Sequence, residues 1–186
     1  MEKAMGKIMT AAAETRAVAG TMTNFRWKIA FLIFLISFVA YMDRVNLSVA
    51  TPVIMQEFGF TKIDMGFIQT CFFASYALMQ VPGGILAEKF GMRKTGALAI
   101  LWWSIFTALT ALAKGKISFA AVRLAFGIGE GPVFPSLGAA TFTWFNKHEK
   151  GKASSSILLG TFFGPVVGPV ATVALMGLFG WHAVFI

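Results

Sequence analysis

The sequence predicts an all-α membrane protein. Apolar residues make up 57% of its 186 residues and charged residues only 13%, whereas a soluble domain has roughly 25% charged residues. Water is therefore not expected to be the main solvent. Five apolar segments are long enough to cross a hydrocarbon core of about 30 Å as helices that rise about 1.5 Å per residue. These predicted spans are residues 27–50, 65–87, 95–113, 117–142 and 153–179, and a sixth helix begins at residue 181.

The segments between the spans set the expected organisation. Residues 1–26 contain no apolar core typical of a signal peptide, so we expect a polar cytoplasmic tail, followed by one transmembrane helical domain over residues 27–186. The longest predicted loop, residues 51–64, joins the first two spans. A tight hairpin at residues 114–116 makes the third and fourth spans antiparallel neighbours. Because the sequence ends inside the predicted sixth helix, we expect a truncated chain.

The distribution of basic residues predicts the orientation. The formal net charge is +8, which alone would suggest nucleic acid. Eleven Lys and Arg residues fall in the tail and in the two connections on the same side of the predicted bundle, and three fall on the opposite side. The positive-inside rule then places the amino terminus in the cytoplasm. Membrane topology explains the charge without a nucleic-acid partner.

Four charged residues interrupt the apolar spans. Asp43 and Arg44 lie in the first span, and Arg123 and Glu130 lie in the fourth. A charge within a membrane span costs about 2.5–3.5 kcal/mol on insertion scales, so it normally faces a cavity, a partner or a substrate. The alternative is a pair of internal salt bridges that hold helices together, since buried ions are usually paired.

Helical geometry separates the two charges of the first span. At about 100° per residue, Arg44 shares a face with other polar side chains, whereas Asp43 lies about 100° away and should face a neighbouring helix. The rise per residue puts Asp43 and Arg123 at one level, with Glu130 about 10 Å nearer the cytoplasm. The polar face of the first span consists of Ser37, Tyr41, Arg44, Ser48 and Thr51, and that of the second consists of Gln69, Tyr76, Gln80 and Gly83.

The connection after the second span contains a family motif. It resembles the signature loop of the major facilitator superfamily, Gly-x-x-x-Asp-Arg/Lys-x-Gly-Arg-Arg/Lys, with Glu88 where Asp is usual. In that family the loop ties neighbouring helices together on the cytoplasmic side and helps to set the outward-open state. The residues that match it are Gly84, Glu88, Lys89, Gly91, Arg93 and Lys94.

Three further motifs resemble the anion:cation symporter branch of that superfamily, whose bacterial members include proton-coupled carriers of galactonate, glucarate and hexuronates. They are Tyr41-Met-Asp-Arg-Val-Asn-Leu-Ser48, Gln80-Val-Pro-Gly-Gly84 and Arg123 followed by Gly-Ile-Gly-Glu130-Gly-Pro-Val-Phe-Pro135. The resemblance implies most of the amino-terminal six-helix bundle of such a carrier.

The same resemblance implies roles for particular residues. Arg44 would bind the substrate carboxylate, and Asp43 and Glu130 would carry the coupling protons. Tyr41, Tyr76 and Gln80 would contact the substrate or line its cavity. Arg123 would interact with the anion or balance its charge. Ordinary helix packing is the alternative for Tyr41, Tyr76 and Gln80.

The fifth span contains Gly160-x-x-x-Gly164-Pro165-x-x-Gly168-Pro169. Small residues at this spacing let helices approach closely in lipid, and proline is tolerated where neighbours satisfy the freed carbonyls. The segment also resembles the glycine-proline motif of antiporters in the superfamily. Close packing or a rocking hinge is the favoured interpretation, and antiport stays open.

These observations predict a secondary active transporter that moves an organic anion such as a sugar acid together with protons by alternating access. No enzyme motif is present, and with one cysteine and no histidine at ligand spacing we expect neither cofactor nor metal site, only the proton as coupling ion. The expected partners are the small organic anion, membrane lipid and a missing carboxy-terminal half. The alternatives are a non-transporting fragment, a half-transporter that needs a partner, and an organic anion antiporter.

Overall fold

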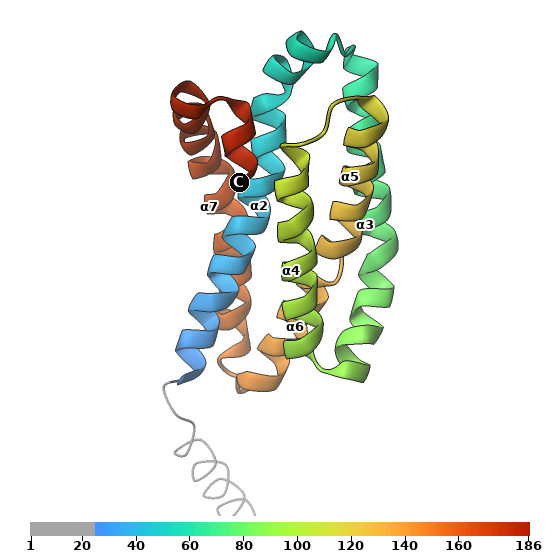
Figure 1. Cartoon of the computed structure of the whole chain (residues 1–186). Coiled ribbons are helices and arrows are strands. Elements are labelled where there is room, and N and C mark those ends of the chain that lie inside the picture. Colours follow the sequence, from blue (N-terminus) through green and yellow to red (C-terminus); the bar gives the residue numbers. More distant parts are fainter. Residues whose placement is uncertain (1–24) are drawn as a thin grey trace, which may run out of the picture.

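The computed structural model describes residues 25–186, and each regular element in that range is a helix (Figure 1). The predicted all-α fold is therefore confirmed, whereas most of the predicted tail, residues 1–26, lies outside the described residues. The elements are α2 (Phe25–Phe58), α3 (Lys62–Phe90), α4 (Met92–Thr110), α5 (Lys116–Glu130), α6 (Val133–Trp144), α7 (Lys150–Phe179) and the 3₁₀ helix η1 (Trp181–Phe185).

Four helical segments of the described chain are long and apolar enough to cross a membrane: Phe25–Phe58, Lys62–Phe90, Lys116–Trp144 and Lys150–Phe179. The helix α4 is not among them, because its first turn contains Arg93 and Lys94. Its 19 residues still correspond to about 28 Å of helix. The predicted count of five spans and the start of a sixth therefore stays a prediction.

The connection between the first two helices is much shorter than predicted. Residues 51–64 were expected to form a loop, but α2 continues through Pro52 to Phe58 and α3 begins at Lys62. Only residues 59–61 separate the two helices. The reversal depends on Gly59, whose φ of 67° is in the region that favours glycine. The loop prediction is wrong because the helix tolerates Pro52 in its interior.

The predicted span over residues 117–142 is divided into α5 and α6. Pro132 has no N–H group to donate to the carbonyl of Ile128, so the hydrogen-bond ladder is interrupted there. The backbone of Gly131 and Pro132 nevertheless keeps right-handed helical angles. The two helices therefore follow one another across the bundle, with an interruption directly after Glu130.

Glycines allow α2 and α7 to pack closely. These helices have the most extensive contact of any pair in the described chain and lie side by side in Figure 1. A Cβ atom on Gly160 would lie 2.5 Å from the carbonyl oxygen of Phe34, and one on Gly164 would lie 2.8 Å from that of Phe38. Both distances are shorter than a van der Waals contact, so the close helix packing predicted from the glycine spacing is confirmed.

The end of the chain folds back against the bundle. The indole of Trp181 is buried and donates a hydrogen bond to Glu57 Oε2 at 2.6 Å. Asn46 on α2 accepts a hydrogen bond from Thr172 on α7 at 2.6 Å and donates one to the carbonyl of Val184 at 3.5 Å. Two of these bonds hold η1 against α2, and the third joins α7 to α2.

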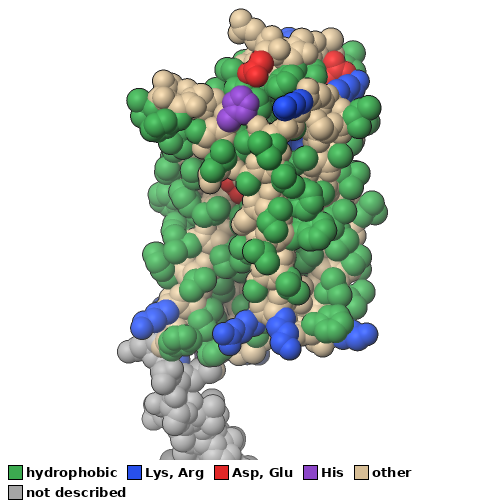
Figure 2. All heavy atoms as spheres, viewed as in Figure 1, with side chains coloured by type: hydrophobic (Ala, Val, Ile, Leu, Met, Phe, Trp, Pro, Cys, Tyr) green, Lys and Arg blue, Asp and Glu red, His purple; other side chains and the backbone are tan. Residues whose placement is uncertain are grey.

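The surface has the polarity of a membrane protein. Figure 2 shows a wall of apolar side chains between two polar ends, with Lys and Arg gathered at the lower end and the acidic side chains concentrated at the upper one. Large apolar side chains such as Leu78, Phe162 and Leu178 are exposed in the described chain. Such exposure would be unfavourable in water and is expected against hydrocarbon.

Candidate functional site

An ion pair between Arg44 and Glu130 lies at the centre of the bundle. Arg44 Nε on α2 donates a hydrogen bond to Glu130 Oε1 at the end of α5, at 2.9 Å. The side chain of Glu130 is 0% exposed, whereas that of Arg44 is 17% exposed. The predicted alternative of a salt bridge between helices is thus present, but only one of its two partners is fully enclosed.

Aromatic rings surround the Arg44 guanidinium. Its Cζ lies 4.5 Å from the ring centre of Tyr76 and 4.7 Å from that of Tyr41, within the range of cation–π attraction. The rings of Phe72 and Phe134 are at 5.5 and 5.8 Å. Four rings from three helices therefore hold the guanidinium in place. A guanidinium whose position is fixed loses less entropy when it binds a carboxylate.

A cavity of about 290 Å³ opens on the Arg44 side of α2. Arg44, Arg123 and Gln69 are among the side chains that line it, together with Tyr41, Ser48 and aromatic residues of α3. Arg44 Nη2 is buried and has no hydrogen-bond partner among the described residues. An arginine with an unused donor beside a second arginine is suited to binding a carboxylate.

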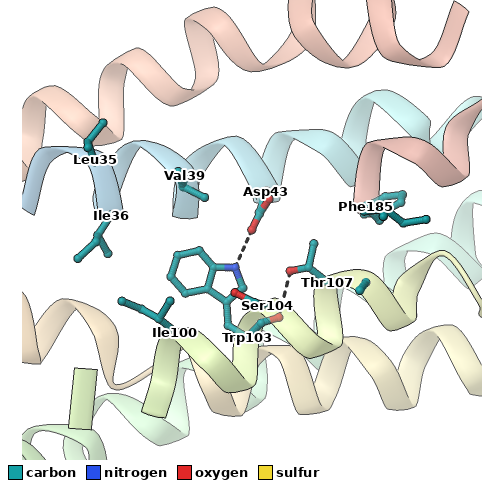
Figure 3. A pocket seen from close by; sticks show the side chains of 11 residues that line it. Leu35, Ile36, Val39, Asp43, Ile100, Trp103, Ser104, Thr107 and Phe185 are labelled. Atoms are coloured by element: carbon teal, nitrogen blue, oxygen red, sulfur yellow. Dashed lines mark hydrogen bonds between the residues drawn. The ribbon is translucent and has the colours of Figure 1, made fainter. Parts of the chain in front are cut away.

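Asp43 faces a neighbouring helix, α4, as the helical geometry predicts. Its carboxylate accepts a hydrogen bond from the indole N–H of Trp103 on α4 at 2.6 Å (Figure 3). A separate cavity of about 330 Å³ lies here between α2 and α4, with Thr107 and Phe185 among its lining residues. Figure 3 shows Asp43 pointing across this space toward α4. The adjacent residues Asp43 and Arg44 thus belong to two different cavities.

Arg123 on α5 is buried between the two acidic residues. It has electrostatic interactions with Asp43 and Glu130, but it forms no ion pair within 4 Å among the described residues. Its guanidinium lies 5.0 Å from the ring centre of Phe126 and 5.6 Å from that of Phe185. Two acids and two arginines therefore share one interior, and only Arg44 and Glu130 are in direct contact.

Most of the residues predicted for the site come together. Arg44, Tyr41 and Arg123 line one cavity, and Tyr76 reaches it through its contact with the Arg44 guanidinium. Gln80 is the exception: it is half-buried on α3, one turn beyond Tyr76, and lines none of the cavities described here. The predicted 10 Å offset does not separate Glu130 from the charges of α2, because the long Arg44 side chain reaches it.

The predicted signature loop is a sharp corner between α3 and α4. Gly91 alone separates the two helices, with a φ of 87°, and Thr95 Oγ1 donates to the carbonyl of Leu86 across the corner at 3.1 Å. The charged side chains of the corner are exposed, and none forms an ion pair with another described residue. They are Glu88, Lys89, Arg93 and Lys94. Gly84 lies one helical turn before them, and a Cβ atom added to Gly84 would lie 3.8 Å from Cβ of Pro135.

Sequence reasoning missed part of the site. Trp103, the hydrogen-bond donor to Asp43, lies in a mostly apolar helix that has no charged residue beyond its first turn, so no charged motif marks it. Gln69 and Ser48 were placed on polar faces but not among the residues expected to contact a substrate. Within the described residues no group of three His, Cys, Asp or Glu side chains could hold a metal ion.

An all-helical membrane bundle with paired charges beside an internal cavity is typical of secondary transporters. The chain belongs to the Major Facilitator Superfamily, which matches residues 33–186. It is 34% identical over 178 residues to the "Probable galactarate/D-glucarate transporter GudP" of Bacillus subtilis, covering 90% of this chain and 38% of that protein. It is 35% identical over 161 residues to the "D-galactonate transporter" of Escherichia coli, covering 87% of this chain and 37% of that protein.

A solved structure has the same fold. The bacterial homologue of the human lysosomal transporter Spinster, in an inward-facing and occupied conformation, superimposes with a TM-score of 0.75 at 21% identity, over 88% of this chain and 41% of that one. The family and these relatives are transporters, not enzymes. The chain spans about two fifths of the length of the two curated relatives.

Proposed function

We propose that the chain forms the amino-terminal half of a carrier that moves an organic anion of the sugar-acid class across a bacterial inner membrane together with protons. Superfamily carriers bind their substrate between two halves that rock about it. The chain would supply five spans and the start of a sixth, with its amino terminus in the cytoplasm, and the missing carboxy-terminal half would complete the site. Two relatives whose names give sugar acids as substrates support this substrate class.

The observation that supports the proposal best is the unequal enclosure of the Arg44–Glu130 pair. Glu130 is sealed inside the protein, whereas Arg44 faces the cavity and keeps an unused donor. A carboxylate that arrives through the cavity would therefore meet Arg44 and not Glu130, which does not line it. Arg44 would bind it by charge-assisted hydrogen bonds, with Tyr41, Tyr76 and Gln80 contacting the substrate or lining its path.

Competition for Arg44 would couple the proton to the anion. While Glu130 is ionised, its carboxylate holds Arg44 at 2.9 Å and weakens the attraction for a second carboxylate. Protonation of Glu130 removes that competition and leaves Arg44 to the substrate. Asp43, which Trp103 holds in a separate cavity, would be the second proton-carrying group, and Arg123 would balance the charge of both acids.

The corner between α3 and α4 would act as the signature loop does in the family and help to set the outward-open state. Its exposed charges are free to pair with other parts of a complete carrier, since they form no ion pairs within the described residues. The residues proposed for this role are Gly84, Glu88, Lys89, Gly91, Arg93 and Lys94.

Uptake of D-glucarate into proteoliposomes tests the proposal, with the assembled carrier that contains this half. We expect an inward proton gradient to drive accumulation and Arg44→Ala to abolish binding. We expect Glu130→Gln to bind and exchange D-glucarate but to lose the response to the gradient. Binding of D-glucarate to Arg44→Ala with unchanged affinity would refute the role of Arg44, and uptake that requires internal counter-substrate would indicate an antiporter.

A further inference from the structure

A second, largely apolar groove lies on the outer wall of the bundle, away from both charged cavities. Its volume is about 440 Å³, and it runs between α3, α4 and the junction of α5 with α6. Phe90, Leu98 and Trp102 form its walls and are 56%, 67% and 45% exposed. Of the functional residues named above, only Lys94 of the corner between α3 and α4 lines this groove.

A glycine shapes the floor of the groove. A Cβ atom on Gly129 would lie 3.0 Å from the backbone nitrogen of Trp103 and 3.1 Å from Cγ of Trp102, so a side chain there would collide with α4. Without one, the Trp102 indole lies across α5 and donates its N–H to the carbonyl of Ala125 at 2.8 Å. The polar atom of the indole is therefore satisfied, and the exposed part of the ring is apolar.

One end of the groove is basic. Lys94 is among its lining residues, and Lys89 and Arg93 are exposed at the same corner of α3 and α4. Along α4, Lys94 and Trp102 are about 12 Å apart. Figure 2 shows Lys and Arg side chains gathered at the lower end of the apolar wall. A ligand that fills the groove would place its charged group at the edge of the membrane and its apolar part within the hydrocarbon.

The dimensions favour a hydrocarbon chain over a protein helix. A volume of about 440 Å³ spread over about 12 Å corresponds to a cross-section of about 37 Å², roughly half that of a helix 10 Å across. A single acyl chain is narrow enough to enter. Basic pockets between membrane helices commonly hold the head groups of anionic lipids.

We propose that this groove binds one anionic phospholipid, with an acyl chain between Leu98, Trp102 and Phe90 and the phosphate against the Lys94 ammonium. Lys94 reaches the phosphate because its apolar stem can lie along the groove while its charge stays at the interface. Binding of this lipid does not depend on the substrate or on proton coupling, so its test is separate from that of the proposed carrier.

Trp102 is a built-in reporter for the experiment. The chain is reconstituted into phosphatidylcholine vesicles. A fixed fraction of the lipid has brominated acyl chains, which quench the fluorescence of nearby indoles. The brominated lipid is phosphatidylglycerol in one set of vesicles and phosphatidylcholine in the other. The difference between the wild type and Trp102→Phe isolates the Trp102 signal from that of the other tryptophans. We expect brominated phosphatidylglycerol to occupy the groove about fivefold more readily than brominated phosphatidylcholine.

Variants of basic residues separate a built site from general attraction. Lys94→Gln should remove the preference for phosphatidylglycerol, and Lys94→Glu should reverse it. Lys152→Gln is the matched control, because Lys152 is an exposed lysine in the first turn of α7, outside the groove. Circular dichroism checks that each variant keeps its helices.

Three results would overturn the proposal. Equal quenching of Trp102 by the two brominated lipids would show ordinary surrounding lipid. An equal loss of preference in Lys94→Gln and Lys152→Gln would show a general effect of charge. No quenching of Trp102 by either lipid would show that another part of the protein or a second copy covers the groove.

Discussion

Removal of the Arg44 guanidinium alone should lower the free energy of unfolding far more than removal of both charges of the Arg44–Glu130 pair. In Arg44→Met the Glu130 carboxylate, 0% exposed, loses its only ion-pair partner within the described residues. Breaking a buried ion pair in this way costs about 3–5 kcal/mol. In Glu130→Gln the charge that is left belongs to Arg44, which is 17% exposed and lies against two tyrosine rings, so the cost should be smaller.

The double variant Arg44→Met with Glu130→Gln removes both charges of this ion pair, so neither partner is left without the other. We expect it to regain about 1–3 kcal/mol relative to Arg44→Met, the range of coupling between residues in contact. The free energy of unfolding is measured in mixed micelles by circular dichroism, with all four proteins of the cycle under the same conditions. Lys116→Met is the control, because Lys116 and Asp64 also form an ion pair, but their side chains are 47% and 20% exposed, so solvent screens their attraction more than that of the enclosed pair.

The reasoning fails if Arg44→Met and the double variant unfold with the same free energy to within about 0.5 kcal/mol. That result would mean that Glu130 is already neutral in the folded protein, or that it finds another partner when Arg44 is removed. If Lys116→Met lowered the free energy of unfolding as much as Arg44→Met does, enclosure of the acidic partner would not determine the size of the loss.

Two glycine positions give further predictions. Gly160→Ala should lower the free energy of unfolding by about 1–3 kcal/mol, because the new Cβ would lie 2.5 Å from the Phe34 carbonyl oxygen. Gly177→Ala is the control: Gly177 has open space around it, so this substitution should be neutral or stabilising. Thermal unfolding of the two variants in detergent gives the comparison, and equal melting temperatures would contradict close packing of α2 on α7. Gly91→Ala should lower the free energy of unfolding by about 1–3 kcal/mol, because φ of Gly91 is 87°. Gly96→Ala should lower it much less, because its Cβ would lie at an ordinary 3.7 Å from Ser136. Similar unfolding midpoints of the two variants in denaturant would count against strain at the corner.

The helical fold and the placement of Asp43 and Arg44 on different faces of α2 could be predicted from the sequence. Long apolar runs require helices in a membrane, and the 100° step between neighbours places Asp43 and Arg44 on different faces. Small residues at four-residue spacing correctly indicated close packing by Gly160 and Gly164. These features depend on local periodicity, which a sequence displays directly.

Features that depend on other helices could not be predicted. The rise per residue locates Cα atoms but not the ends of long side chains, so the sequence did not show that Arg44 reaches Glu130. The partner of Asp43 was hidden because Trp103 lies in a mostly apolar helix whose charged residues are confined to its first turn. The helical continuation of α2 past Pro52 was missed because proline and polar residues are typical of a loop, while η1 and α3 stabilise that turn of helix from outside.

The short connections limit how the bundle can move. Gly91 alone joins α3 to α4, and Gly180 alone joins α7 to η1, and one residue adds at most about 3.8 Å of chain. Sliding one helix past its neighbour by a turn would require about 5.4 Å, more slack than these joints contain. α3 could shift that far along α4 only by unwinding, so these two helices are mechanically a single body, and the same holds for α7 and η1.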